Sequence, residues 1–124
     1  TLSGVGATLK NQYPGIVIWA VEPENAAILS GGAITTHLQM GIGDGLIPEN
    51  LDMNIYSHIC VVSDDEALET SRRLMREEGM ICGISSGSNV AGALRLAKRL
   101  GPGKRVVTVI PDTGERYFST ALFE

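Results

Sequence analysis

Three short apolar runs rich in β-branched residues punctuate the chain. Runs of this length and composition are typical of parallel strands that are buried on both faces. The predicted strands are Ile16–Val21, His58–Val62 and Arg105–Ile110.

Apolar residues recur at helical spacing between and beside these runs. The clearest helix signal is a capping box, Ser63-Asp64-Asp65-Glu66, which opens a helix that we expect to end at Gly79. Two more helices and two short helical segments are predicted from periodicity and turn residues: Leu2–Gln12, about Ser88–Leu100, Asn25–Leu29 and Phe118–Phe123.

Strands and helices therefore alternate along the chain. This order predicts an α/β fold with a three-layer architecture, a parallel sheet with helices on both faces. No internal repeat and no linker divides the sequence, so residues 1–124 are expected to form a single domain. The glycine-rich stretch from residue 30 to residue 48 is predicted to be a long loop, and loops of that length are often functional.

Composition narrows the classes of function. The chain has 124 residues, a net charge of −4 and no basic run, so a surface for nucleic acid or an acidic membrane is not expected. No apolar stretch is long enough to cross a bilayer. Cys60 and Cys82 form no CxxC pair and have no histidine at ligand spacing, which predicts no metal site. We expect two free thiols in a cytoplasmic protein.

Open α/β sheets bind ligands at the carboxyl ends of their strands, next to helix starts. Ser85, in a glycine-bounded turn before a helix, has two interpretations. Its hydroxyl either caps the helix or contacts a ring nitrogen or a phosphate. Four segments are candidates for this ligand edge: Thr1 with the helix after it, Gly41–Pro48, Gly83–Gly87 and Pro111–Tyr117.

Neither the glycine loop nor the lysines indicate a particular ligand or a catalytic residue. The loop has the spacing G-x-G-x-G with no strand directly before it, so a dinucleotide site is rejected and a flexible connector remains possible. A lysine that forms a Schiff base should lie in a partly buried pocket. None of Lys10, Lys98 and Lys104 lies in a glycine-rich segment.

Read together, these segments resemble the cysteine synthases (O-acetylserine sulfhydrylases) of the tryptophan-synthase-β-like family. The resemblance runs from Thr1 to Phe123, and its short blocks occur in the family's order. They are Thr1-Leu2-Ser3-Gly4-Val5-Gly6, Val21-Glu22-Pro23, Gly41-Ile42-Gly43-Asp44-Gly45-Leu46-Ile47-Pro48, Gly83-Ile84-Ser85-Ser86-Gly87, and Pro111 through Tyr117 with Ser119-Thr120.

The resemblance implies a pyridoxal 5'-phosphate cofactor and assigns residues to it. Thr1 matches the last threonine of the phosphate loop, and Ser85 matches the serine that binds the pyridine nitrogen. Gly41 and Gly43 match the loop on the substrate side, which in the family also receives the C-terminal peptide of serine acetyltransferase. The implied reaction is a β-replacement that makes cysteine from O-acetylserine and sulfide, in a homodimeric enzyme.

The family's Schiff-base lysine has no counterpart here, so this chain is expected to hold no catalytic residue. The resemblance places that lysine upstream of Thr1, and makes the chain the C-terminal part of the cofactor domain of a longer enzyme. Two alternatives remain open. One is cystathionine β-synthase or another β-replacing relative, because Asp44 would fit a different substrate loop. The other is a folded, non-catalytic binding module.

Overall fold

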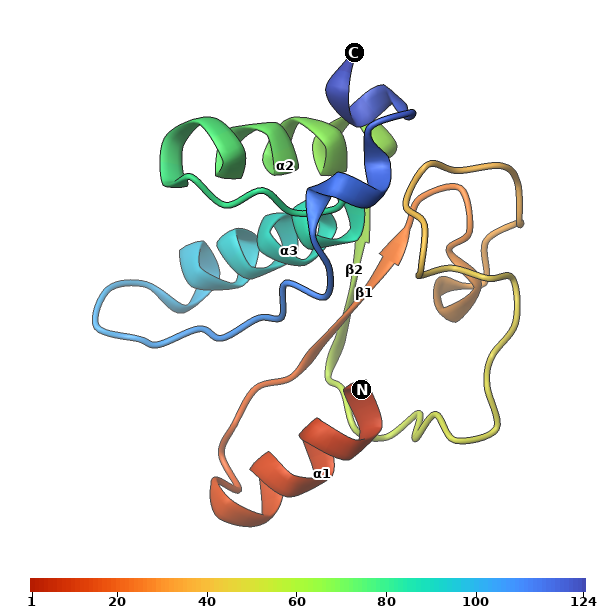
Figure 1. The fold of residues 1–124 in the computed structure, drawn as a ribbon. Coiled ribbons are helices and arrows are strands. Elements are labelled where there is room, and N and C mark those ends of the chain that lie inside the picture. Colours follow the sequence, from red (N-terminus) through yellow and green to blue (C-terminus); the bar gives the residue numbers. More distant parts are fainter.

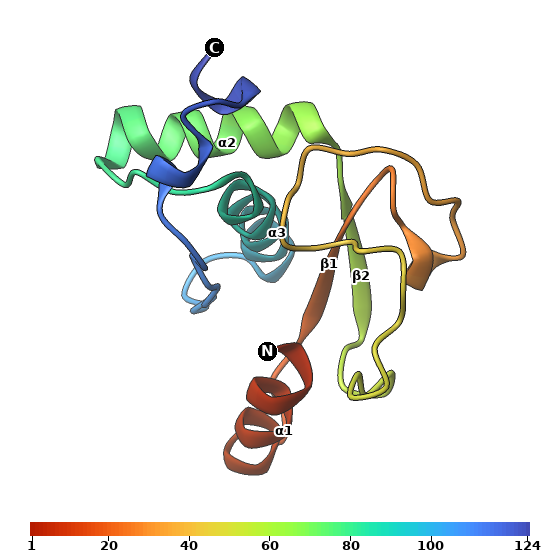
Figure 2. The ribbon, with the colours of Figure 1, turned by 45° about the vertical axis from the view of Figure 1, so that its right-hand side comes forward.

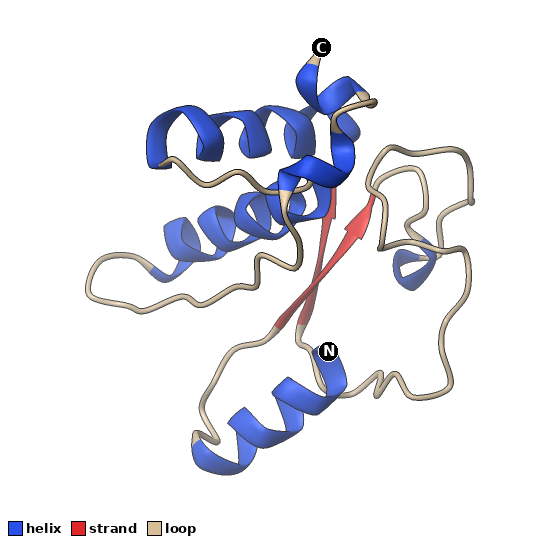
Figure 3. Cartoon of the chain, in the orientation of Figure 1, coloured by secondary structure: helices blue, strands red, loops and turns tan.

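The computed structural model describes residues 1–124 and contains two parallel strands that run side by side (Figure 3). In the pairing of β1 with β2, Trp19 lies opposite His58 and Pro23 opposite Val62. This confirms the predicted α/β class with a parallel sheet. The elements follow one another as α1 (Leu2–Gln12), β1 (Trp19–Pro23), η1 (Ile28–Ser30), β2 (His58–Val62), α2 (Asp64–Glu78), α3 (Ile84–Leu100), η2 (Gly114–Tyr117) and η3 (Ala121–Phe123).

The core lies between the strands and α3, and α2 packs on α3 (Figure 1). Gly92 of α3 permits close approach to the sheet, because a Cβ atom there would lie 2.9 Å from Cγ2 of Val21. Burial of a side chain such as Val62 or Ile84 stabilises the fold by about 1.5–3 kcal/mol. The core consists of Cys60, Val62, Ala67, Leu68, Ile84, Ala91, Tyr117 and Leu122.

The ends of α2 follow from its sequence. The Ser63 hydroxyl accepts a hydrogen bond from the Glu66 backbone amide at 3.3 Å, as the capping box predicts. Asp64, Asp65 and Glu66 place negative charge at the positive end of the helix, which is favourable. Gly79 ends the helix with a φ of 68°, a conformation that suits glycine. This part of the prediction is confirmed.

The prediction of a third strand is wrong. Residues 105–110 are extended but pair with no strand. Val107 is 82% exposed, and the segment is held by bonds to Asn89 of α3, including Asn89 Nδ2 to Val109 O at 2.9 Å. A β-branched run has the composition of a strand, but it needs a neighbouring strand, and β1 and β2 pair only with each other.

Smaller differences concern where elements begin and end. β1 begins at Trp19 rather than Ile16, and α3 begins at Ile84 rather than Ser88. The two predicted short helical segments are single 3-10 turns, η1 and η3. No helix has the length and apolar character needed to cross a membrane.

The contact between α2 and α3 at Gly87 gives a test of this packing. A Cβ atom at residue 87 would lie 2.0 Å from the Ala67 carbonyl oxygen and 2.4 Å from Ser71 Oγ. Gly87→Ala should therefore force the helices apart and lower the free energy of unfolding by about 1–3 kcal/mol, measured by urea unfolding.

Gly4→Ala is the matched control, since Gly4 lies in α1 and a Cβ atom there meets nothing within 4 Å. This change should stabilise the chain by about 0.5–1 kcal/mol. Equal stability of the two variants would contradict the packing described here.

Candidate functional site

The carboxyl ends of β1 and β2 are covered by the glycine loop, as expected for a ligand edge. A Cβ atom at Gly43 would lie 2.7 Å from Cγ of Pro23, the last residue of β1. The Gln39 side-chain amide donates to the carbonyl of Val62, the last residue of β2, at 2.9 Å. Ser88 of α3 donates to Gln39 Oε1 at 2.7 Å. The first turns of α3 and the loop carrying Gly41 and Gly43 therefore lie at the same edge.

Ser85 does not cap α3. The N-cap residue is Gly83, and no side chain makes a cap hydrogen bond at this helix end. Ser85 is only 4% exposed, and the adjacent Ser86 hydroxyl is buried without a hydrogen-bond partner. Buried hydroxyls are normally hydrogen-bonded, so Ser86 Oγ is an exception at this helix start. Of the two interpretations of Ser85, helix capping is thus wrong.

The segment after residue 110 closes over this helix start. Gly83 has no room for a side chain, because a Cβ atom would lie 2.4 Å from Asp112 Oδ1 and 2.5 Å from Cε2 of Tyr117. An isolated antiparallel bridge joins Cys82 to Thr113. The Tyr117 hydroxyl donates to Asp112 Oδ2 at 2.5 Å, whereas Asp112 Oδ1 is buried without a partner. Sequence analysis singled out this segment but missed the pair, since nothing local shows that Tyr117 turns back onto Asp112.

Burial favours the neutral forms of Tyr117 and Cys82 at the start of α3. It raises the pKa of Tyr117 to about 12, and the hydrogen bond to Asp112 acts in the same direction. Burial also raises the pKa of the Cys82 thiol; the neighbouring Ser86 and Ser71 hydroxyls oppose this rise, and the Asp112 charge adds to it. Cys82 is therefore a poor nucleophile at neutral pH.

The glycine loop has a defined backbone. Gly41, Gly43 and Gly45 have φ values of 89°, 71° and 77°, which favour glycine. His37 links the loop's two ends, since its Nδ1 accepts from the Gln39 amide at 3.2 Å and its Nε2 lies 3.1 Å from the Gly43 carbonyl oxygen. These partners assign the proton to Nε2. The His37 ring therefore holds the backbone of the glycine loop.

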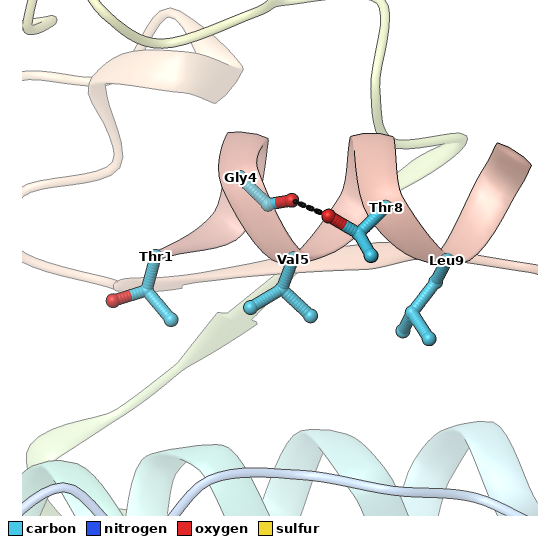
Figure 4. A pocket seen from close by; sticks show the side chains of 5 residues that line it. All are labelled: Thr1, Gly4, Val5, Thr8 and Leu9. Carbon is cyan, nitrogen blue, oxygen red and sulfur yellow. Dashed lines mark hydrogen bonds between the residues drawn. The ribbon is translucent and has the colours of Figure 1, made fainter.

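Thr1 lies apart from the other predicted site residues, near the start of the strands (Figures 1 and 2). It is the N-cap of α1 and is exposed, and its side chain makes no cap hydrogen bond. An open groove of about 550 Å³ runs along this helix, lined by Thr1, Gly4, Val5, Thr8 and Leu9 (Figure 4). Thr8 Oγ1 donates to the Gly4 carbonyl at 3.0 Å. The Thr1 hydroxyl makes no cap hydrogen bond and can bond to a ligand.

The chain's lysines lie away from this edge. Lys98 and Lys104 are exposed, and Lys10 Nζ donates to the Asn54 carbonyl at 3.3 Å. No group of three or more histidine, cysteine or acidic side chains is arranged to hold a metal ion.

The structure is that of a parallel α/β protein in which buried serines at the start of α3 and a glycine loop lie at the carboxyl ends of the strands. Residues 1–112 match the family of pyridoxal-phosphate dependent enzymes, and the chain belongs to this family. The chain is 52% identical over 123 residues to a cysteine synthase from Staphylococcus aureus (strain Mu50), covering 99% of this chain and 40% of that protein. The family's cofactor is pyridoxal phosphate.

Solved structures agree with this assignment. A crystal structure of O-ureido-L-serine synthase matches 99% of this chain with a TM-score of 0.94 and 41% identity, over 39% of its own length. The O-acetylserine dependent cystathionine β-synthase of Helicobacter pylori matches 100% of this chain with a TM-score of 0.91 and 37% identity, over 40% of its length. The chain thus spans about 40% of the curated relatives it matches.

The Tyr117–Asp112 pair predicts a dependence of stability on alkaline pH. Between the unfolded pKa of 10.0 and the folded value of about 12, the unfolded chain has lost the Tyr117 proton while the folded chain keeps it. The stabilisation is thus fully present below the unfolded value and is lost as pH rises through this window.

Tyr117→Phe should remove this part of the pH dependence, so its free energy of unfolding should fall less between about pH 9 and about pH 11, by about 1 kcal/mol. Urea unfolding at both pH values measures the difference. The control is Tyr13→Phe, because Tyr13 is 61% exposed. Parallel pH profiles for Tyr117→Phe and the parent chain would contradict the prediction.

Proposed function

We propose that this chain is the C-terminal part of the cofactor domain of a cysteine synthase. The longer enzyme makes L-cysteine from O-acetylserine and sulfide by β-replacement. The observation that carries the proposal is Ser85, a buried serine at the start of α3 that does not cap its helix. The 52% identity to a cysteine synthase supports the choice of reaction.

The residues at this edge fit the cofactor. A serine hydroxyl donates to an unprotonated ring nitrogen, and Ser85 is buried where such a bond is not weakened by water. The positive end of the α3 dipole disfavours a positive charge there, so the nitrogen stays unprotonated. When bound, the cofactor supplies an electron sink for the bonds that are made and broken at the amino acid.

Thr1 is proposed to bind the cofactor phosphate. Its hydroxyl is uncommitted, and the backbone amides that begin α1 favour an anion. Thr1 makes no direct contact with Ser85, and its assignment is supported by the match of residues 1–112 to the family of pyridoxal-phosphate dependent enzymes. No lysine lies at the ligand edge, so we assign the Schiff-base lysine to the part of the enzyme upstream of Thr1.

Gly41 and Gly43 are proposed to line the substrate side of the site. Their positive φ values turn the backbone at the carboxyl ends of the strands, where an amino-acid substrate approaches a cofactor held by Ser85. The same loop would receive the C-terminal peptide of a serine acetyltransferase. We infer a homodimer by analogy with the family, and a cytoplasmic location because both cysteines are free and buried.

An O-acetylserine dependent cystathionine β-synthase is the second candidate. The structural match to the Helicobacter pylori enzyme supports it, as does Asp44, an exposed acid in the substrate loop. The two candidates share the donor and differ in the sulfur nucleophile. A panel of nucleophiles therefore separates them.

The purified longer enzyme, loaded with pyridoxal phosphate, should turn over O-acetylserine with sulfide faster than with homocysteine. Cysteine and cystathionine formation are measured by mass spectrometry. A preference for homocysteine would favour the second candidate, and no turnover with either nucleophile would contradict both.

The isolated chain of 124 residues is the control in this assay, because its lysines lie away from Ser85. It should give no activity and no stoichiometric lysine adduct after borohydride reduction with pyridoxal phosphate. One fully labelled lysine would favour a catalytic role for this chain alone, against the proposed division of the site.

Ser85→Ala in the longer enzyme should weaken cofactor binding and lower kcat/KM with O-acetylserine, each by about tenfold, since one buried hydrogen bond is lost. Cofactor absorbance gives the affinity. Ser119→Ala is the matched control, because Ser119 is exposed. Unchanged cofactor affinity in Ser85→Ala would rule out the proposed contact.

A further inference from the structure

Gln39 is a fully buried polar side chain, with 0% exposure, at the start of the glycine loop. Its Nε2 donates to the Val62 carbonyl at 2.9 Å and to Asp64 Oδ1 at 3.0 Å. Its Oε1 accepts from the Ser88 hydroxyl at 2.7 Å. One amide thus joins the end of β2, the first turn of α2 and the second turn of α3.

Two further hydrogen bonds hold the backbone at Leu38 and Gln39. Asp64 Oδ2 accepts from the Leu38 amide at 2.9 Å, while Oδ1 of the same carboxylate accepts from Gln39. The backbone N–H of Gln39 donates to His37 Nδ1 at 3.2 Å. The chain is therefore held at consecutive residues just before the loop turns at Gly41.

The contact with α3 links the loop to the proposed cofactor contact. Ser88 follows Ser85 by three residues and so lies about one helical turn further along α3. Gly41 follows Gln39 by two residues. Gln39 therefore connects the backbone just before the substrate loop to the helix that carries Ser85.

Only a side chain that donates twice and accepts once satisfies these partners. An apolar residue of the same size would leave the Val62 carbonyl and one oxygen of Asp64 without their donor. A glutamate would bring a second negative charge to Asp64 and has no N–H group to donate. The hydrogen-bond partners at residue 39 therefore require a side-chain amide. Filling the space at this position would not by itself require one.

We propose that Gln39 is a positioning residue that holds the Gly41–Gly43 loop against α3 and thereby sets the affinity for the amino-acid substrate. The inference rests on the proposed function for the identity of that substrate. Gln39 acts through the loop backbone and is assigned no contact with substrate.

Gln39→Met keeps the length of the side chain and removes its hydrogen bonds. In the cofactor-loaded longer enzyme it should raise KM for O-acetylserine about tenfold and change kcat less than about threefold, with the cofactor absorbance spectrum unchanged. Gln12→Met is the matched control, because Gln12 is exposed at the end of α1, and its KM should equal that of the parent enzyme.

Ser88→Ala removes the contact of Gln39 with α3, together with the bond from Ser88 Oγ to the Ile84 carbonyl at 3.3 Å, and keeps the test decisive if Gln39→Met does not fold. It should raise KM by a smaller factor, and Gln39→Met with Ser88→Ala should raise it no more than Gln39→Met does by itself. Additive factors in this cycle would overturn the link between the two residues.

Hydrogen exchange separates positioning from general support of the fold. The Ile42 amide is bonded to the Gln39 carbonyl at 3.4 Å, so loosening the loop should speed exchange of residues 40–45 in Gln39→Met, while α2 and β2 keep the parent rates. Faster exchange throughout the chain, or an unchanged KM in both variants, would overturn the proposal.

Failure of the proposed function has a different signature. If the parent enzyme shows no turnover of O-acetylserine, the substrate assignment is wrong, and the exchange experiment alone decides whether Gln39 holds the loop. Local acceleration in residues 40–45 then supports the positioning role, and an unchanged loop overturns it.

Discussion

The close approach of α2 and α3 at Gly87 is the constraint on which the rest of the structure depends. Only hydrogen occupies the space between this residue and the backbone of Ala67, so the two helices meet without intervening side chains. Ser71 of α2 can then donate its hydroxyl to the Gly83 carbonyl at 2.9 Å. The start of α3 is thus positioned by its neighbour.

This arrangement explains why the serines at the start of α3 remain available. A helix that had to cap itself would use a side chain near its first turn, and Ser85 would be the obvious choice. Leaving a polar group buried and unbonded costs about 1–3 kcal/mol, and both Ser86 Oγ and Asp112 Oδ1 are in this state. Both atoms lie at the start of α3 or against it, beside the proposed contact at Ser85.

Features set by neighbouring residues were predictable from the sequence, whereas contacts between distant segments were not. The capping box at Ser63 and the stop at Gly79 depend on a few adjacent residues, and both are confirmed. The run from Arg105 to Ile110 has the composition of a strand, but pairing depends on what lies beside it. Gln39 gave no signal because its partners are 23 to 49 residues away.

Substrate choice depends on which parts of the proposed site are buried and which are exposed. O-ureido-L-serine synthase and the Helicobacter pylori cystathionine β-synthase share this backbone with TM-scores above 0.9, so enzymes with different names use one framework. At the start of α3, Asp112 and Tyr117 pack against Gly83 and leave no room for a larger side chain there. Beyond Gln39 the loop becomes exposed, with Met40 53% and Leu46 62% accessible. Substitutions at the exposed positions Met40, Asp44 and Leu46 therefore disturb the core least, and selectivity can vary there while the proposed contact at Ser85 stays fixed.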